Sequence, residues 1–373
     1  MREYLLTFFI AASVTYLVVG LAGRFAYWVG AVPPTRDRDV HREPVPRLGG
    51  IAMLTGMLVA MLVASYLPRM RDVFTESSDA WALILAAVVI CLIGVADDIW
   101  DLSALAKFAG QVVAAGLLVA LGVQLLYLPL PGGTFVLDQT QGAIMTVVLV
   151  VGASNAVNFV DGLDGLAAGV VGIGAAAFFA YAYLLSVENN NSSYMTTSAL
   201  VSVVVVGICA GLLPHNAHPA KIFMGDSGAM LIGLLLAAGS ISLTGRLPSQ
   251  DVDTSSFLLT LLPLVLPLAV ILLPFLDMML AVVRRTRAGK SPFAPDKMHL
   301  HHRLLEIGHS QWRAVAIMWV WAALVSGGLV VVALVGGWTT YVLLALAVVV
   351  MIAFTTGHPR RLFRRGQQQP SAV

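Results

Sequence analysis

The chain has 373 residues, of which 58% are hydrophobic and only 11% are charged, and its mean hydropathy is +0.87. This composition excludes a conventional soluble core and indicates a polytopic helical membrane protein. A net charge of +2 gives no sign of a basic arm that would bind nucleic acid. The two cysteines, Cys91 and Cys209, lie inside apolar runs, which is typical of small core residues and not of a disulfide framework or a metal pair.

About eleven apolar segments are each long enough for a helix across about 30 Å of hydrocarbon. The first run continues to about Val32 without a small-residue cleavage site, so we expect a retained span and not a secretory signal. The fold class is therefore predicted to be all-α. The predicted spans lie near residues 4–31, 48–67, 80–96, 104–125, 141–158, 163–185, 196–213, 227–243, 257–279, 312–334 and 338–356.

Lys and Arg are distributed unequally between alternate loops, with fifteen in one set of connections and four in the other. Because cytoplasmic loops are enriched in Lys and Arg, the first set is predicted to be cytoplasmic, with the N-terminus outside and the C-terminus inside. We expect a single transmembrane catalytic domain, 1–356, followed by a basic cytoplasmic tail, 357–373. The predicted cytoplasmic loops are 33–47, 97–103, 158–163, 214–226 and 284–311.

An acidic cluster ends the third predicted span. Asp97, Asp98 and Asp101 lie within five residues, and Lys107 follows in the first turns of the next span. One carboxylate is enough to cap a helix, and three this close repel each other unless a cation compensates. An ionisable group at bilayer depth costs roughly 2.5–3.5 kcal/mol, so the cluster favours a functional site over a simple cap.

A polar stripe joins the fifth and sixth predicted spans. Gly162 and Gly165 predict that the helix breaks there and that backbone N–H groups face a ligand. Carboxylate and amide oxygens suit a hard cation such as Mg²⁺. Asp226 is expected to be a further metal ligand, with an N-cap role as the alternative. The members of the stripe, which recur every three residues, are Asn155, Asn158, Asp161 and Asp164.

Three histidines, His299, His301 and His302, lie in a basic loop before the tenth predicted span. Zinc binding is the obvious role for such histidines, but no cysteine or acidic partner lies at tight spacing. Their Arg and Lys neighbours make them more typical of donors to phosphate oxygens. The alternative, a basic loop attracted to anionic lipid, explains the arginines well and the histidines poorly.

Together the motifs predict a cytosolic-face site in which Asp and Asn oxygens hold Mg²⁺ and a His/Arg/Lys loop holds phosphates. These are the requirements of phosphoryl transfer, where positioning and charge neutralisation supply most of the rate. A site at the membrane edge suits a lipid phosphate and a soluble nucleotide as substrates. A secondary transporter is the alternative from another class, but transporters generally carry such groups near mid-membrane and often show internal repeats.

These motifs resemble the polyprenyl-phosphate N-acetylhexosamine-1-phosphate transferase superfamily, of glycosyltransferase 4 type. That superfamily includes the bacterial GlcNAc-1-phosphate transferases and the phospho-MurNAc-pentapeptide transferase. The resemblance runs in family order across most of the chain. Its segments are PVPRLGGIAML (44–54), DDIWDLSALAKF (97–108), NAVNFVDGLDGLAAG (155–169), FMGDSG (223–228) and PFAPDKMHLHHRL (292–304).

The resemblance implies transfer of GlcNAc-1-phosphate from UDP-GlcNAc to undecaprenyl or decaprenyl phosphate, with release of UMP. This would be the first membrane step of cell-envelope polysaccharide synthesis, with Mg²⁺ or Mn²⁺ as the cofactor. The expected partners are the UDP-sugar, the lipid phosphate, the bilayer of the bacterial plasma membrane and, as an open expectation, a second copy of the chain. HLHHRL (299–304) resembles the GlcNAc branch, because the MurNAc-pentapeptide branch typically has three consecutive histidines before Phe-Glu. The phospho-MurNAc-pentapeptide transferase branch is the alternative.

The resemblance also implies roles for single residues. The catalytic residues would be Asp97, Asp98, Lys107, His299, His301 and His302. The substrate-binding residues would be Asn155, Asn158, Asp161, Asp164, Phe223, which would stack on uracil, and Arg303. The metal ligands would be Asp226, Asn158 and Asp161. For the mechanism we expect direct attack by the lipid phosphate on the sugar-linked phosphorus, with a covalent aspartyl-phosphate as the rival route.

Overall fold

The computed structural model describes residues 1–32, 44–130, 133–188, 193–244, 261–262, 264–266, 286 and 310–356. Every predicted span except 257–279, most of which lies outside the described residues, coincides with a helix. The helices are α1 (Arg2–Val29), α2 (Gly49–Ala64), α3 (Arg71–Thr75), α4 (Asp79–Trp100), α5 (Ala104–Ala120), α6 (Gln139–Val160), α7 (Leu166–Glu188), α8 (Ser193–Asn216), α9 (Gly225–Thr244), α12 (Gln311–Val335) and α13 (Trp338–Thr356).

Eight of the described helices are long and apolar enough to cross a membrane, namely α1, α4, α6, α7, α8, α9, α12 and α13. The helices α2 and α5 are apolar but shorter, at 16 and 17 residues. The prediction of a polytopic helical membrane protein is therefore confirmed. The total of about eleven spans and the side on which each terminus lies stay predictions.

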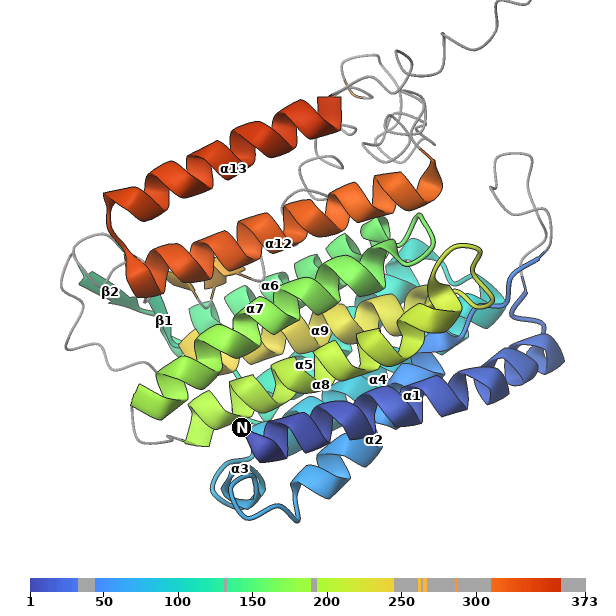
Figure 1. Ribbon diagram of the computed structural model, residues 1–373. Coiled ribbons are helices and arrows are strands. Elements are labelled where there is room, and N and C mark those ends of the chain that lie inside the picture. Colours follow the sequence, from blue (N-terminus) through green and yellow to red (C-terminus); the bar gives the residue numbers. More distant parts are fainter. Residues whose placement is uncertain are drawn as a thin grey trace, which may run out of the picture.

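A small β-hairpin lies between α5 and α6. Its strands, β1 (Tyr127–Leu130) and β2 (Gly133–Val136), pair antiparallel. A capping box then starts α6, because Asp138 accepts a hydrogen bond from the Gln141 backbone and the Gln141 side chain accepts one from the Asp138 backbone. The hairpin lies at one end of the helix bundle, beside the start of α6 (Figure 1).

Helix α9 occupies the centre of the bundle, and α4, α6 and α8 pack around it (Figure 1). A helix that is apolar on all sides is stable when protein or lipid surrounds it, and for α9 the surroundings are protein, because its apolar window is completely buried. Helices α1 and α2 lie on one side of the bundle. On the other side α12 packs on α7, and α13 packs on α12.

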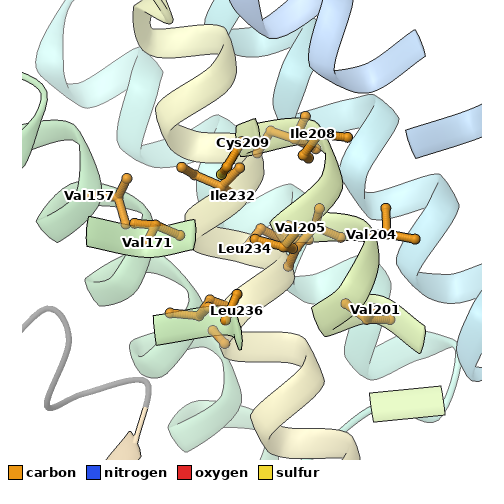
Figure 2. Close-up of a cluster of buried hydrophobic side chains, with 14 of the residues drawn as sticks. Val157, Val171, Val201, Val204, Val205, Ile208, Cys209, Ile232, Leu234 and Leu236 are labelled. Atoms are coloured by element: carbon orange, nitrogen blue, oxygen red, sulfur yellow. The ribbon is translucent and has the colours of Figure 1, made fainter. Parts of the chain in front are cut away.

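Figure 2 shows the core around α9, where β-branched and leucine side chains from α6, α7 and α8 meet those of α9. Cys209 and Cys91 are both buried free thiols, as expected of small core residues. The core side chains labelled in the close-up are Val157, Val171, Val201, Val204, Val205, Ile208, Cys209, Ile232, Leu234 and Leu236. This packing fixes the position of α9, whose first turn carries Asp226.

Glycines allow α2 and α4 to approach the start of α9 closely. A Cβ atom at Gly50 would overlap the backbone of Gly228, and one at Gly94 would overlap the backbone of Ser227. Close backbone approach at small residues is a common way for membrane helices to associate. These contacts bring the end of α4 against the start of α9.

Exposed tryptophans mark both ends of the bundle. Trp28, Trp100 and Trp312 are 82%, 71% and 51% exposed at the end where α4 finishes and α12 begins. Trp81 and Trp338 are 52% and 76% exposed at the opposite end. Tryptophan is enriched at membrane–water interfaces, so these rings indicate the two bilayer boundaries. Asp97, one turn before Trp100, lies at the level of one boundary.

Candidate active site

Four helix ends converge at the boundary that Trp100 marks. Helix α4 continues to Trp100, so Asp97 and Asp98 lie in its last turn and not in a loop. Helix α5 starts with Ser103 as N-cap, whose hydroxyl accepts a hydrogen bond from the Ala106 N–H at 3.3 Å. The end of α6 and the start of α9 complete the group. The structure thus brings together residues that are 119 and 128 positions apart in the sequence.

Lys107 bridges two carboxylates. Its Nζ atom lies 2.9 Å from Asp97 Oδ2 and 2.6 Å from Asp226 Oδ2. The second oxygen of Asp97 accepts the Leu102 backbone N–H at 2.9 Å, and the Asp97 side chain is only 7% exposed. Charge-assisted hydrogen bonds of this kind are strong, and one ammonium group partly neutralises both carboxylates.

The Asp98 carboxylate caps α9 from a different helix. It accepts hydrogen bonds from the backbone N–H of Asp226 at 2.9 Å, from the backbone N–H of Ser227 at 3.1 Å and from the Ser227 hydroxyl at 2.8 Å. Gly225 has φ +72°, and a Cβ atom there would lie 2.5 Å from Asp98 Oδ2. Because Asp98 satisfies the first N–H groups of α9 and its negative charge suits the helix N-terminus, Asp226 does not serve as the N-cap.

Asn158 and Asn155 point to different partners. The Asn158 amide donates a hydrogen bond to Asp226 Oδ1, which adds Asn158 to the acidic cluster. Asn155, one turn deeper, donates to Gln111 Oε1 at 2.7 Å and to the Val151 carbonyl at 2.8 Å. The structure therefore unites Asn158 with Asp226 but places Asn155 against Gln111. A substrate-binding role for Asn155 stays a prediction.

The predicted helix break between α6 and α7 is confirmed. Helix α6 ends at Val160, Asp161 follows as its C-cap, and Gly165 has φ +73° just before α7. The pKa of Asp161 is raised to about 7, first because the surrounding protein desolvates the carboxyl and then because Asp226 and Asp98 are negative, although Arg47 opposes the rise. No described residue donates a hydrogen bond to this carboxyl.

The Asp164 carboxylate binds the segment before α9. Its Oδ2 atom lies 2.8 Å from His218 Nδ1 and accepts the Ala220 N–H at 3.2 Å. Asn216 accepts the Gly165 N–H at 3.1 Å and donates to the Ile222 carbonyl at 3.0 Å. Sequence reasoning missed Asn216 and His218, although their polar side chains in the HNAHPAKIF segment (215–223) were a usable signal.

Phe223 is held by its backbone. Its N–H donates to the Pro46 carbonyl at 2.9 Å, and its carbonyl accepts the Gly49 N–H at 3.0 Å. These bonds bring PVPRLGGIAML (44–54) beside FMGDSG (223–228), two segments of the family resemblance. Stacking of Phe223 on uracil stays a prediction.

The predicted phosphate-binding residues His299, His301, His302 and Arg303 lie outside the described residues. The described chain resumes at Ser310, the N-cap of α12. Trp319 of α12 donates a hydrogen bond from Nε1 to the Gly165 carbonyl at 3.2 Å. The start of α12 therefore lies at the same end of the bundle as the acidic cluster.

The oxygen donors at this site fit a hard divalent cation. Asp226, Asp161 and the Asn158 amide supply two carboxylates and one neutral oxygen, and Mg²⁺ usually takes one or two carboxylates and completes its shell with water and phosphate. The Asp161 carboxyl has negative neighbours that a cation would offset. Within the described part of the chain, no three His, Cys, Asp or Glu side chains are already grouped as a metal site.

Fold and site together define a multi-pass membrane protein with an acidic, lysine-bridged site at one membrane boundary. Comparison with known proteins identifies the family. The model of glycosyl transferase family 4 matches residues 80–244. The chain is 48% identical to decaprenyl-phosphate N-acetylglucosaminephosphotransferase of Mycobacterium leprae, over 88% of this chain and 83% of that protein. The chain therefore belongs to glycosyl transferase family 4.

Two further relatives show the range of the family. The protein with the same name from Mycolicibacterium smegmatis is 44% identical over 99% of this chain and 92% of its own length. Phospho-N-acetylmuramoyl-pentapeptide-transferase of Halalkalibacterium halodurans is 31% identical over 74% of this chain and 80% of its own length. The similarity is thus greater, and extends further, to the two decaprenyl-phosphate N-acetylglucosaminephosphotransferases.

Proposed function

We propose that this protein transfers GlcNAc-1-phosphate from UDP-GlcNAc to a polyprenyl phosphate and releases UMP. The observation that carries the proposal is the Lys107 bridge between Asp97 and Asp226, beside Asn158 at a membrane boundary. Such a site lies within reach of a lipid phosphate and of a soluble nucleotide. The two relatives of highest identity described above are named for this transfer to decaprenyl phosphate.

The proposed reaction requires Mg²⁺, held by Asp226, Asp161 and Asn158. When bound, the ion would offset the negative charge of the diphosphate. Lys107 supplies a second positive charge on the side of Asp97. Asp98 orients Asp226 by holding its backbone N–H.

The lipid phosphate is the proposed nucleophile. The second pKa of a phosphate monoester is about 6, so the lipid phosphate is largely ionised at neutral pH and needs alignment more than a strong base. Its oxygen forms a bond to the sugar-linked phosphorus, and the bond from that phosphorus to UMP breaks. A phosphorylated Asp trapped from UDP-GlcNAc in the absence of lipid would overturn this direct route in favour of a covalent one.

The proposal places the site on the cytoplasmic face of a bacterial plasma membrane, where UDP-sugars are available. It is supported by the fifteen Lys and Arg in one set of loops against four in the other.

His299, His301 and His302, with Arg303, are proposed to hold the diphosphate from the basic loop. A homodimer is also proposed, and analytical ultracentrifugation in detergent would test it.

The test is UMP release by the purified full-length protein in detergent. We expect release from UDP-GlcNAc only when both polyprenyl phosphate and Mg²⁺ are present. UDP-MurNAc-pentapeptide in a parallel reaction tests the alternative branch, and faster turnover of that donor would move the protein to it. Mass analysis of the lipid product identifies the sugar and the prenyl chain. If neither donor leads to UMP release, the proposal is rejected.

A further inference from the structure

The indole of Trp319 ties α12 to the loop between α6 and α7. Its Nε1–H donates to the Gly165 carbonyl at 3.2 Å, and the same oxygen accepts the Gly169 N–H at 3.1 Å as part of the first turn of α7. A carbonyl oxygen has two lone pairs, so it can accept both donors. Trp319 therefore holds the point at which this loop becomes α7.

The loop, residues 161–165, carries both Asp161 and Asp164. Gly165, its last residue, adopts the left-handed conformation with φ +73°. Its N–H donates to Asn216 of α8, and its carbonyl accepts from Trp319 of α12. Both polar backbone groups of Gly165 are thus held by neighbouring helices, and a shift of either helix would move the loop.

The contact between α7 and α12 is shaped for the indole. A Cβ atom at Gly169 would overlap the Trp319 ring, so only glycine leaves room for it at this position. Trp312 packs edge-on against Trp319, with ring centroids 5.8 Å apart and an interplanar angle of 77°. Helices α7 and α12 lie side by side in Figure 1. The tryptophan fills a specific place and does not merely face lipid.

We propose that Trp319 is a positioning residue for the reaction proposed above. It anchors Gly165, the last residue of loop 161–165, to α12, and this loop begins with Asp161. That helix directly follows the segment that carries His299, His301 and His302 in the sequence. Trp319 thereby links α12 to loop 161–165, in which Asp161 is a proposed metal ligand. The inference rests on the proposed function, because it names a positioning residue for that reaction.

The test compares Trp319→Phe with Trp321→Phe. Both variants lose one indole hydrogen bond from α12, but Trp321 donates to Thr355 Oγ1 of α13, at 3.0 Å, and not to the site loop. We expect kcat/KM for UDP-GlcNAc to fall about tenfold in Trp319→Phe, the upper range for one lost hydrogen bond. The Mg²⁺ concentration for half-maximal rate should rise in the same variant. Trp321→Phe should stay within about twofold of the wild-type rate, as expected away from the site.

Amide hydrogen exchange supplies a readout that does not depend on activity. Exchange in peptides covering residues 161–169 should be faster in Trp319→Phe and unchanged in Trp321→Phe, because only the first loses the anchor at Gly165. Gly169→Ala keeps the tryptophan but displaces its ring, so it should reproduce both effects. It serves as the second variant if Trp319→Phe does not fold.

The outcomes separate the two proposals. If the wild-type protein releases no UMP, the proposed function fails, and the exchange data still decide whether Trp319 holds the loop. If the wild type is active and Trp319→Phe matches Trp321→Phe in kcat/KM, the positioning role is overturned, whatever the exchange data show. A fall in kcat/KM without faster exchange also overturns it, because the effect would not pass through the loop.

Discussion

The Asp98 carboxylate accepts a hydrogen bond from the backbone N–H of Asp226 at 2.9 Å, so one acidic residue holds another by its main chain. The Asp226 side chain is thereby left to Lys107 and Asn158. The two aspartates consequently have different functions, although both are acidic residues of the same cluster. Asp98 orients the start of α9, and Asp226 presents its oxygens to the site.

Replacement of Asp98 by Ala should reduce both stability and activity. The N–H groups of Asp226 and Ser227 would lose their acceptor, at a cost of about 1–3 kcal/mol in the free energy of unfolding. Misplacement of Asp226 should lower kcat about 100-fold. Thermal unfolding in detergent and UMP release measure the two effects. Asp101→Asn is the control, because Asp101 is exposed and Asn tolerates its left-handed conformation, and a wild-type unfolding midpoint in Asp98→Ala would contradict the cap.

Asp226→Ala should separate activity from folding. The variant keeps the backbone N–H that Asp98 holds, so we expect an unfolding midpoint near that of the wild type. It loses the carboxylate next to Asn158 and Lys107, so UMP release should be abolished at ordinary Mg²⁺ concentrations. Turnover of Asp226→Ala at the wild-type rate would remove this residue from the proposed metal site.

Lys107→Gln should lower both the rate and the Mg²⁺ concentration that gives the half-maximal rate. Asp97 and Asp226 would lose their shared counter-charge, and the rate should fall about 100-fold, as when one charge-stabilising donor is removed. The Mg²⁺ concentration for half-maximal rate should fall as well, because the ammonium group no longer competes for Asp226. A titration of UMP release against Mg²⁺ measures both quantities. Lys107→Arg keeps the charge and should restore part of the rate, whereas a higher Mg²⁺ requirement in Lys107→Gln would speak against this competition.

Gly50→Ala should destabilise the bundle, whereas Gly116→Ala should not. A Cβ atom at Gly50 would overlap the backbone of Gly228, and overpacking of this kind costs about 1–3 kcal/mol. Nothing lies within 4 Å of a Cβ atom at Gly116, so Ala there should be neutral or slightly stabilising. Thermal unfolding of the two variants in the same detergent makes the comparison. Equal midpoints would show that α2 and α9 do not meet at Gly50.

The amino-acid sequence by itself predicted the helices and singled out several of the polar residues that the structure brings together. Long apolar runs specify membrane helices because the bilayer leaves no other partner for backbone polar groups, and every predicted span within the described residues is a helix. The break before α7 was readable because Gly162 and Gly165 interrupt an apolar pattern. The grouping of Asn158 with Asp226 was also expected, because carboxylate and amide oxygens suit one hard cation and both residues were predicted to bind it.

Only the tertiary structure decided which polar residue meets which partner. Sequence spacing did not show that Asp98 caps α9, that Asn155 bonds to Gln111 or that Asp164 meets His218. Those pairings depend on how each helix is rotated about its axis and on how closely glycines let two backbones approach. Local sequence fixes where a helix begins and ends, but rotation and approach are set by packing against helices that are distant in the chain.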